Sequence, residues 1–253
     1  MRLVIMVCVL VCLTSSAWAG ETEVFLKSGY FDWKETVSGK GIIRERGLVS
    51  GAGIAYTGFV GERMFIRPSL EVWGGNIDYQ GFQVGTWAPL EGDTTYFGTV
   101  EEVRVGLKLQ AGDAFSVSPF AVLGHKFWLR SLSVEDWNSI YGRIGVRGAT
   151  KHLFAEGGVT LPVYTRVHTD WSSDGYNDFV TEPKNKPSAF AEAGATFGQW
   201  TIGVFYEQME FGQSDTVRVE RSSGSAGAVL VASGAFQPDS VAHHIGLKVG
   251  FSF

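Results

Sequence analysis

Two pairs of polar residues in this 253-residue chain have the chemical types that hydrolysis requires. His168 lies two residues before Asp170, and Asn76 lies two residues before Asp78. A His/Asp pair can activate a water molecule when the imidazole has a pKa near neutrality and faces a cleft. We expect instead that His168 faces the interior of the fold and pairs with a carboxylate, and that the protein is not an enzyme.

The segments that must position these residues alternate between apolar and polar side chains. Within residues 96–110, the odd-numbered positions from 103 to 109 are apolar, whereas the even-numbered positions from 102 to 108 are Glu, Arg, Gly and Lys. Such alternation predicts a strand whose two faces meet different environments. Residues 241–253 alternate in the same way. In lipid, a strand at a chain end satisfies its backbone only by pairing on both edges within a closed sheet.

Ten segments fit the template of a membrane-spanning β-strand, which needs roughly 9–11 residues. They are residues 24–33, 48–60, 64–78, 96–110, 117–130, 140–149, 153–168, 188–197, 200–211 and 241–253. Short turns join them at one end, and longer connections, among them residues 35–47 and the segment after Asp78, join them at the other. The sequence therefore predicts an all-β fold. We expect an antiparallel up-and-down transmembrane β-barrel of ten strands, with eight as the alternative and both termini on the periplasmic side.

The polar faces of these strands predict a charged lumen. Its predicted members are Lys27, Arg67, Glu71, Glu102, Arg104, Lys108, Lys126, Arg130, Arg143, Arg147, Glu156, Arg166, Glu192, Glu207 and Lys248. In this set the bases outnumber the acids two to one. A barrel of this size is narrow enough for side chains to fill. We therefore expect a network of ion pairs that plugs the lumen, and the alternative is a narrow anion-preferring pore lined by the surplus bases.

Two charged or titratable residues break this pattern. Glu101 and His125 fall on the lipid-facing sides of their strands, where we expect Glu101 to lie near a membrane interface. Hydrolysis of a lipid ester at His125 would require an adjacent serine nucleophile, and no neighbouring serine is suitably placed in the sequence.

The first 19 residues predict an export signal. An apolar run at 3–13 follows a basic residue, and an Ala-Trp-Ala step at 17–19 suits signal peptidase. Cleavage before Gly20 would leave one domain, residues 20–253, without cysteine, because both cysteines lie within the signal. The formal net charge of −5 disfavours nucleic-acid binding. We expect no cofactor and no metal.

Five residues near the C-terminus resemble the assembly signal of bacterial outer-membrane β-barrel proteins. That signal combines a polar residue, a glycine, two alternate apolar residues and a final Phe, which are here His244, Gly246, Val249, Phe251 and Phe253. The resemblance to this broad superfamily of eight- to ten-stranded surface barrels, which includes opacity-type proteins, implies Sec-type export to the bacterial outer membrane. It also implies contact with lipid and lipopolysaccharide, passage through periplasmic chaperones and the barrel-assembly machinery, and a monomeric state.

The ten-stranded architecture is also similar to that of the omptin proteases, whose active sites lie at the outer rim. Here Asn76 replaces one of the paired aspartates of that family, and His168 precedes Asp170 where omptins have Asp before His. The resemblance thus covers architecture and rim position only. We expect a non-catalytic scaffold that displays surface loops for adhesion, ligand contact or envelope integrity. The alternatives are the narrow pore and an omptin-like rim hydrolase.

One predicted connection contains an apolar stretch at residues 226–232, between Ser/Gly-rich and Pro-containing segments. This stretch can form a hairpin that extends the barrel, fold into its mouth, or serve as a surface patch for a partner. The sequence leaves the three alternatives open.

Overall fold

A computed structural model describes residues 20–82, 88–112, 114–222 and 229–253. The expected export signal at 1–19 lies outside the described residues. Within them, no helix is long and apolar enough to cross a membrane.

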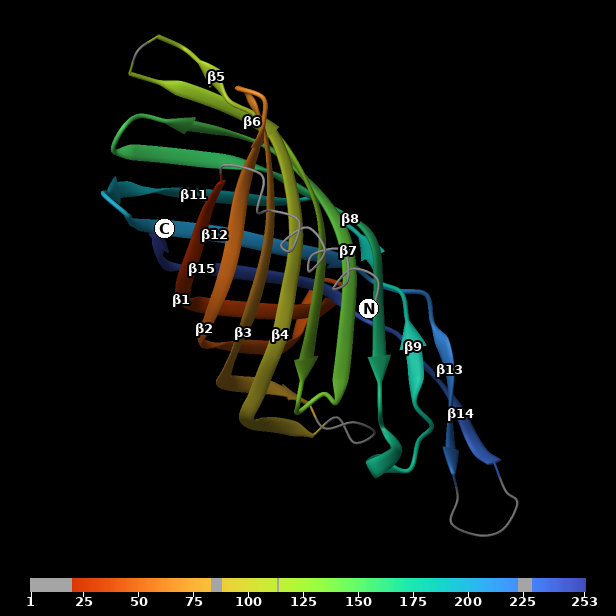
Figure 1. Cartoon of the computed structure of the whole chain (residues 1–253). Coiled ribbons are helices and arrows are strands. Elements are labelled where there is room, and N and C mark those ends of the chain that lie inside the picture. Colours follow the sequence, from red (N-terminus) through yellow and green to blue (C-terminus); the bar gives the residue numbers. More distant parts are fainter. Residues whose placement is uncertain (1–19, 83–87, 113, 223–228) are drawn as a thin grey trace.

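Ten long strands form a closed antiparallel barrel (Figure 1). They are β1 (Gly20–Val37), β2 (Lys40–Val60), β3 (Met64–Phe82), β4 (Pro89–Leu107), β6 (Ser116–Arg130), β7 (Glu135–Ala149), β8 (Leu153–Thr169), β11 (Ser188–Phe197), β12 (Trp200–Gly212) and β15 (Asp239–Ser252). Each strand pairs with its neighbour in sequence order, and β15 pairs with both β12 and β1. The pairing of the last strand with the first closes the sheet, which confirms the prediction of ten strands.

Six short elements complete the described structure. They are β5 (Leu109–Gln110), the 3-10 helix η2 (Ser172–Asp174), β9 (Phe179–Thr181), β10 (Lys184–Asn185), β13 (Val217–Ser222) and β14 (Val229–Ala235). β13 and β14 pair only with each other as a hairpin, which projects beyond the barrel on the side away from the C-terminus (Figure 1). Of the three alternatives for residues 226–232, the described part forms this hairpin, and residues 226–228 lie outside the described residues. We call this end of the barrel the hairpin end and the end with Gly20 and Phe253 the terminal end.

The outward face of the barrel is apolar, as contact with lipid requires. On β12 and β15, for example, Ile202, Val204, Ile245 and Leu247 alternate with inward residues, and each is about half exposed. This alternation follows the predicted pattern, because successive side chains of a strand point to opposite faces.

The predicted connection at residues 35–47 is wrong, because these residues extend β1 and β2. The two strands meet at a tight turn where residues 38 and 39 have φ angles of 51° and 76°, as in a type I′ hairpin. Glu35 and Glu45, whose polarity suggested a loop, point into the barrel and pair with Arg130. Their polarity therefore reflects an interior charge cluster. β3 and β4 also extend beyond their predicted limits.

A β-bulge in β8 reverses the predicted orientation of the end of this strand. The register between β7 and β8 shifts at Val163, which has no partner on β7. Because one extra residue exchanges the two faces of a strand, Val167 is buried in the interior, whereas Arg166 and His168 face outward. The predictions that Arg166 and His168 face the lumen are therefore wrong.

Candidate functional site: the filled lumen and the rim

Buried side chains fill the half of the lumen nearer the hairpin end. We call this cluster the aromatic plug, and its members are Phe31, Trp33, Val49, Trp73, Ile77, Tyr96, Trp128, Trp137, Val167, Phe211 and Ala242. Each member is at most 6% exposed. Every barrel strand except β11 contributes at least one member. The plug is thus built from the whole circumference of the barrel.

Ring contacts in the plug connect opposite walls. Trp33 on β1 packs edge-on against Trp137 on β7 with the ring centroids 5.2 Å apart, and Trp137 stacks on Trp128 at 5.0 Å. β1 and β7 are on opposite sides of the closed sheet, so these rings meet across the lumen. Phe31 on β1 also reaches Tyr96 on β4, at 5.2 Å. Such offset and edge-to-face pairs add to the stabilisation from burial.

A buried guanidinium lies against the plug and joins three carboxylates. Arg130 Nη1 donates to Glu35 Oε1 and Glu135 Oε2, each at 2.7 Å, and Nη2 donates to Glu45 Oε1 at 2.6 Å. The Arg130 side chain is fully buried, and its guanidinium lies 5.1 Å from the Trp33 ring. We call these four charged residues the arginine clamp. Since β1 and β2 face β6 and β7 across the barrel, the clamp ties opposite walls together.

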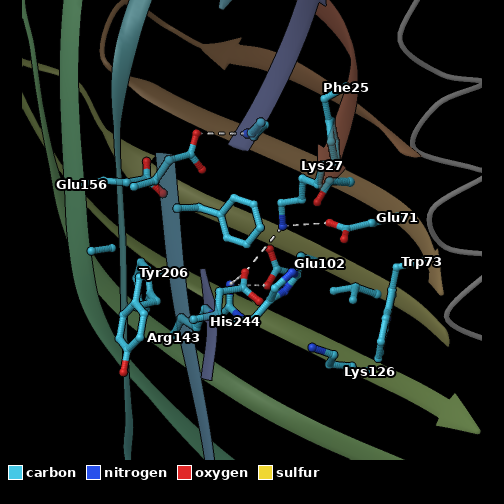
Figure 2. A pocket seen from close by; sticks show the side chains of 18 of the residues that line it. Phe25, Lys27, Glu71, Trp73, Glu102, Lys126, Arg143, Glu156, Tyr206 and His244 are labelled. Atoms are coloured by element: carbon cyan, nitrogen blue, oxygen red, sulfur yellow. Dashed lines mark hydrogen bonds and ion pairs between the residues drawn. The ribbon is translucent and has the colours of Figure 1, made fainter. Parts of the chain in front are cut away.

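The other half of the lumen, nearer the terminal end, holds a network of paired charges (Figure 2). Lys27 Nζ lies 3.0 Å from Glu71 and 3.6 Å from Glu207. Arg143 lies 3.0 Å from Glu102 and 3.7 Å from Glu207. Glu207 therefore links two cations, and the expected network of ion pairs is present in this half.

Closer to the terminal end the same arrangement continues. Arg104 binds Glu156 through two hydrogen bonds of 2.9 and 3.0 Å, and Arg147 donates to the same carboxylate at 3.0 Å. Lys248 Nζ lies 3.3 Å from Glu192. Bidentate pairs of this kind are strong and fix the geometry of both partners.

The interior is balanced in charge, so the predicted excess of bases is wrong. Glu23, Glu35, Glu45 and Glu135 also face inward, whereas Arg166 does not. Leaving aside the exposed acid at position 21, nine bases and nine acids of the described residues face the interior, which are Lys27, Arg67, Arg104, Lys108, Lys126, Arg130, Arg143, Arg147 and Lys248 with Glu23, Glu35, Glu45, Glu71, Glu102, Glu135, Glu156, Glu192 and Glu207. The four added acids lie outside the predicted strand limits, which is why alternation missed them.

Two of the interior bases form no ion pair within 4.0 Å in the described part of the chain. Lys126 is buried, and its Nζ lies 5.0 Å from the centre of the Trp73 ring, within reach of a cation–π interaction (Figure 2). Lys108 lines the open cavity at the terminal end. These two lysines belong to the lumen, as predicted, but not to its ion-pair network.

Two cavities lie in the charged half. One of about 90 Å³ lies among Lys27, Glu71, Arg143 and their neighbours. Another of about 380 Å³ lies toward the terminal end and is lined by residues such as Thr201 and Lys108. At ~30 Å³ per water molecule, the second cavity has room for roughly ten waters. Water can therefore enter the charged half, whereas close-packed rings occupy the other half.

His168 lies on the outer surface near the hairpin end, between two carboxylates. Its Nδ1 is 2.8 Å from Asp136 Oδ2 on β7, and its Nε2 is 3.2 Å from Asp178 Oδ2 in the connection after β8. The hydrogen bonds to Asp178 and Asp136 raise the pKa of His168 above its ordinary value. Asp170 does not bind the ring and instead accepts the backbone N–H of Ser172 at 2.9 Å. The predicted pairing with a carboxylate is confirmed, but it lies on the outer face and not in the lumen.

The second pair of the candidate hydrolytic site lies elsewhere on the barrel. Asn76 and Asp78 are exposed on the outside of β3, and Ile77 between them points into the plug. β4, β6 and β7 separate β3 from the strand that carries His168. The two pairs therefore do not face a common cleft. Within the described residues, no group of three or more His, Asp or Glu side chains could hold a metal ion.

Glu101 and His125 form a pair that sequence reasoning missed. They lie directly opposite each other on β4 and β6, and His125 Nδ1 is 2.7 Å from Glu101 Oε2. Both side chains are on the outward face, as predicted, and each compensates the polarity of the other. Alternation gives the face of a residue, but only the register between strands shows that two such residues are neighbours.

The residues of the predicted assembly signal lie on β15 and just after it. Val249, Phe251 and Phe253 face outward, and the Phe251 ring lies 4.9 Å from an indole ring of β12. His244 and Gly246 face the interior. The alternation proposed for this segment is therefore present, and its role in assembly stays a prediction.

Comparisons with known proteins agree with this fold. No family model matches the chain, and no curated protein matches it. Among solved structures, the outer membrane protease OmpT from Escherichia coli aligns with a TM-score of 0.53 and 9% identity over 92% of this chain and 96% of that chain. The outer membrane protein OprG from Pseudomonas aeruginosa aligns with a TM-score of 0.37 and 11% identity over 93% and 97% of the two chains.

Neisserial surface protein A aligns with a TM-score of 0.33 and 8% identity over 92% of this chain and 97% of that chain. The ten-stranded barrel is thus similar in fold to that of the outer membrane protease OmpT. At these identities the likeness concerns the fold alone.

Proposed function

We propose that this protein is a non-catalytic, non-conducting scaffold of the bacterial outer membrane that displays the connections at its hairpin end for adhesion, ligand contact or envelope integrity. The observation that carries the proposal is the contact between Trp33 and Trp137 across the lumen. Plug residues from nine of the ten barrel strands surround this contact. A small barrel filled in this way offers rigidity rather than passage.

In this proposal the terminal end faces the periplasm, after Sec-type export and cleavage near Gly20. The apolar outward face then contacts outer-membrane lipid and lipopolysaccharide, and the hairpin of β13 and β14 projects outside the cell. Periplasmic chaperones and the barrel-assembly machinery would handle the chain before insertion. We propose a monomer, because a closed barrel leaves no long strand edge to pair with another copy.

The geometry of the rim supports a non-catalytic role. A histidine that activates water needs one ring nitrogen directed at the substrate, whereas both ring nitrogens of His168 bind aspartates. The balanced interior charge also removes the surplus of bases on which the anion-preferring pore depends.

Single-channel recording in planar bilayers tests the proposal. We expect no conductance steps above the bilayer baseline from the wild-type barrel. The double variant Trp33→Ala, Trp137→Ala is the matched control, because it removes the rings that meet across the lumen and should produce steps if it inserts. Reproducible steps from the wild type would show that the pore alternative is correct.

A further inference from the structure

The arginine clamp contains more acids than its base can neutralise. Glu35, Glu45 and Glu135 all contact Arg130, and no other basic side chain of the described residues lies within 4.0 Å of these carboxylates. Their side chains are 2%, 0% and 11% exposed. With all four groups ionised, the clamp would carry a net charge of −2 in the interior of the barrel.

Buried carboxylates that share one site do not all remain ionised. Each carboxylate raises the cost of ionising the next, and water is too scarce in the interior to screen the repulsion. Glu35 and Glu135 even share the same nitrogen, Arg130 Nη1, with both distances at 2.7 Å. One of the three acids must therefore hold a proton over part of the physiological pH range.

Hydrogen-bond donors favour the ionised form of two of the acids. Glu45 receives Arg130 Nη2 on one oxygen and the hydroxyl of Tyr96 on the other. Glu35 receives Nη1 and the indole N–H of Trp33, the latter at 2.9 Å, with a longer contact from an amide. Donors to a carboxylate stabilise its negative charge.

Glu135 has the weakest support for a negative charge. Its donors, Arg130 Nη1 and the Trp137 indole N–H at 2.8 Å, both bind Oε2. No hydrogen bond in the described structure reaches Oε1 of Glu135 or Oε2 of Glu35, so each of these oxygens is free to carry a proton; Glu35 differs by its additional amide contact of 3.4 Å from Gln237. Glu135 is also the most exposed of the three acids, which gives the proton a route to solvent.

The groups that face Glu135 come from several strands. The charged or titratable groups around it are Glu35 on β1, Glu45 on β2, Tyr79 on β3, Tyr96 on β4 and Arg130 on β6. Asp136 and His168, on β7 and β8, point to the outer surface and pair with each other. Arg130 is thus the single cation among the described groups that face the site.

We infer that the arginine clamp is a proton-binding site, in which Glu135 holds the proton and its release at higher pH weakens the tie between opposite walls of the barrel. Before release, the β6 and β7 side of the clamp carries +1 from Arg130 and attracts the two carboxylates of β1 and β2; after release this side is neutral, so the attraction across the lumen weakens. This inference concerns a pH response at the hairpin end and goes beyond the proposed scaffold function.

The titration of Glu135 gives the pH window. Glu135 lies outside the apolar span of β7, whose outward side chains become apolar only from Ile140 onward. Burial, together with the charges of Glu35 and Glu45, raises the pKa of Glu135 to about 7, compared with ~4.3 in an unfolded chain. For an acid with a raised pKa, the folded state binds the extra proton. The stability from this proton is full below the unfolded pKa and is lost as the pH rises toward 7.

The test compares thermal unfolding of the refolded barrel at about pH 5.5 and about pH 8.5, at constant ionic strength. A His168→Gln background removes the other titration at this end. In that background we expect the midpoint to fall by roughly 4–8 °C between the two pH values. Glu135→Gln should abolish most of this fall and raise the midpoint at the higher pH. Asp136→Asn is the matched control, because this neighbour points outward and should leave the fall unchanged.

An equal fall in the Glu135→Gln variant would overturn the inference. Infrared difference spectra of the parent barrel provide a measurement that does not depend on the folding of that variant. We expect the carbonyl band of a buried carboxylic acid at about pH 5.5 and its loss at about pH 8.5. A barrel without such a band at the lower pH would also overturn the inference.

Discussion

The two halves of the lumen are filled by different kinds of side chain. Near the hairpin end, indole and phenol rings meet across the barrel, and one fully buried arginine binds three glutamates. Near the terminal end, charges are paired in small groups around cavities of about 90 and 380 Å³. The first half is closed by packing, whereas the second is polar and has space for water.

This difference determines how each half should respond to the loss of a charge. A buried ion that loses its partner keeps its desolvation cost and has no solvent to replace the lost contact. A partly exposed ion that loses its partner is solvated again, so the cost is small. Arg130 and Arg147 form a natural pair for this comparison, because loss of Arg130 leaves its buried carboxylates without a cation, whereas loss of Arg147 leaves the buried Glu156 still bound by Arg104.

The largest effect is expected from Arg130→Met. The three glutamates of the arginine clamp would then remain buried without their cation, and we expect a loss of roughly 3–5 kcal/mol in the free energy of unfolding. Arg147→Met should cost about 1 kcal/mol or less, because Glu156 retains its bidentate contact with Arg104. Denaturant titration of the refolded barrels measures both values. Similar losses in the free energy of unfolding from the two variants would contradict the proposed difference between the two halves in their response to the loss of a charge.

A smaller effect is expected when the pH is raised through the pKa of His168, on the outer surface of the hairpin end. Protonated His168 connects Asp136 on the barrel wall to Asp178 in the connection after β8. Its pKa is raised, so this stabilisation is complete below the unfolded value of ~6.5 and is lost as the pH rises through the higher folded value. Protection factors of the amides in residues 170–178, which correct for the base-catalysed intrinsic exchange rate, should therefore be lower at about pH 9 than at about pH 6, by several-fold at most.

His168→Gln is the control for this prediction. It should make the protection factors in residues 170–178 low at both pH values and leave the midpoint of global unfolding almost unchanged. Exchange that stays slow in the variant would mean that His168 does not hold this connection.

The sequence was sufficient to predict the barrel, because a strand between lipid and a filled interior must alternate. The apolar faces of β4, β12 and β15 and the closing role of the last strand follow from this constraint. The same rule placed Arg104, Glu156 and Lys248 in the lumen. These predictions depend on local spacing, which the side-chain period of a strand makes visible.

The features that the sequence did not predict depend on register. The bulge at Val163 turns His168 outward, and no local sequence pattern predicts the extra residue. Glu35 and Glu45 looked like loop residues, because their partner Arg130 lies on a distant strand. His168, Glu35 and Glu45 are therefore residues whose contacts could not be predicted from the alternation of apolar and polar side chains.

Thiol labelling of single-cysteine variants tests most directly whether the aromatic plug excludes solvent while the charged half near the terminal end admits it. Expression of the chain from residue 20 removes both native cysteines. Val49→Cys places a thiol in the plug, where Val49 is 1% exposed, and Thr201→Cys places one in the cavity at the terminal end. With a charged, membrane-impermeant thiol reagent, we expect rapid labelling at position 201 and none at position 49 until the barrel unfolds. Equal labelling of the two positions in the folded barrel would contradict the account of a lumen closed near its hairpin end.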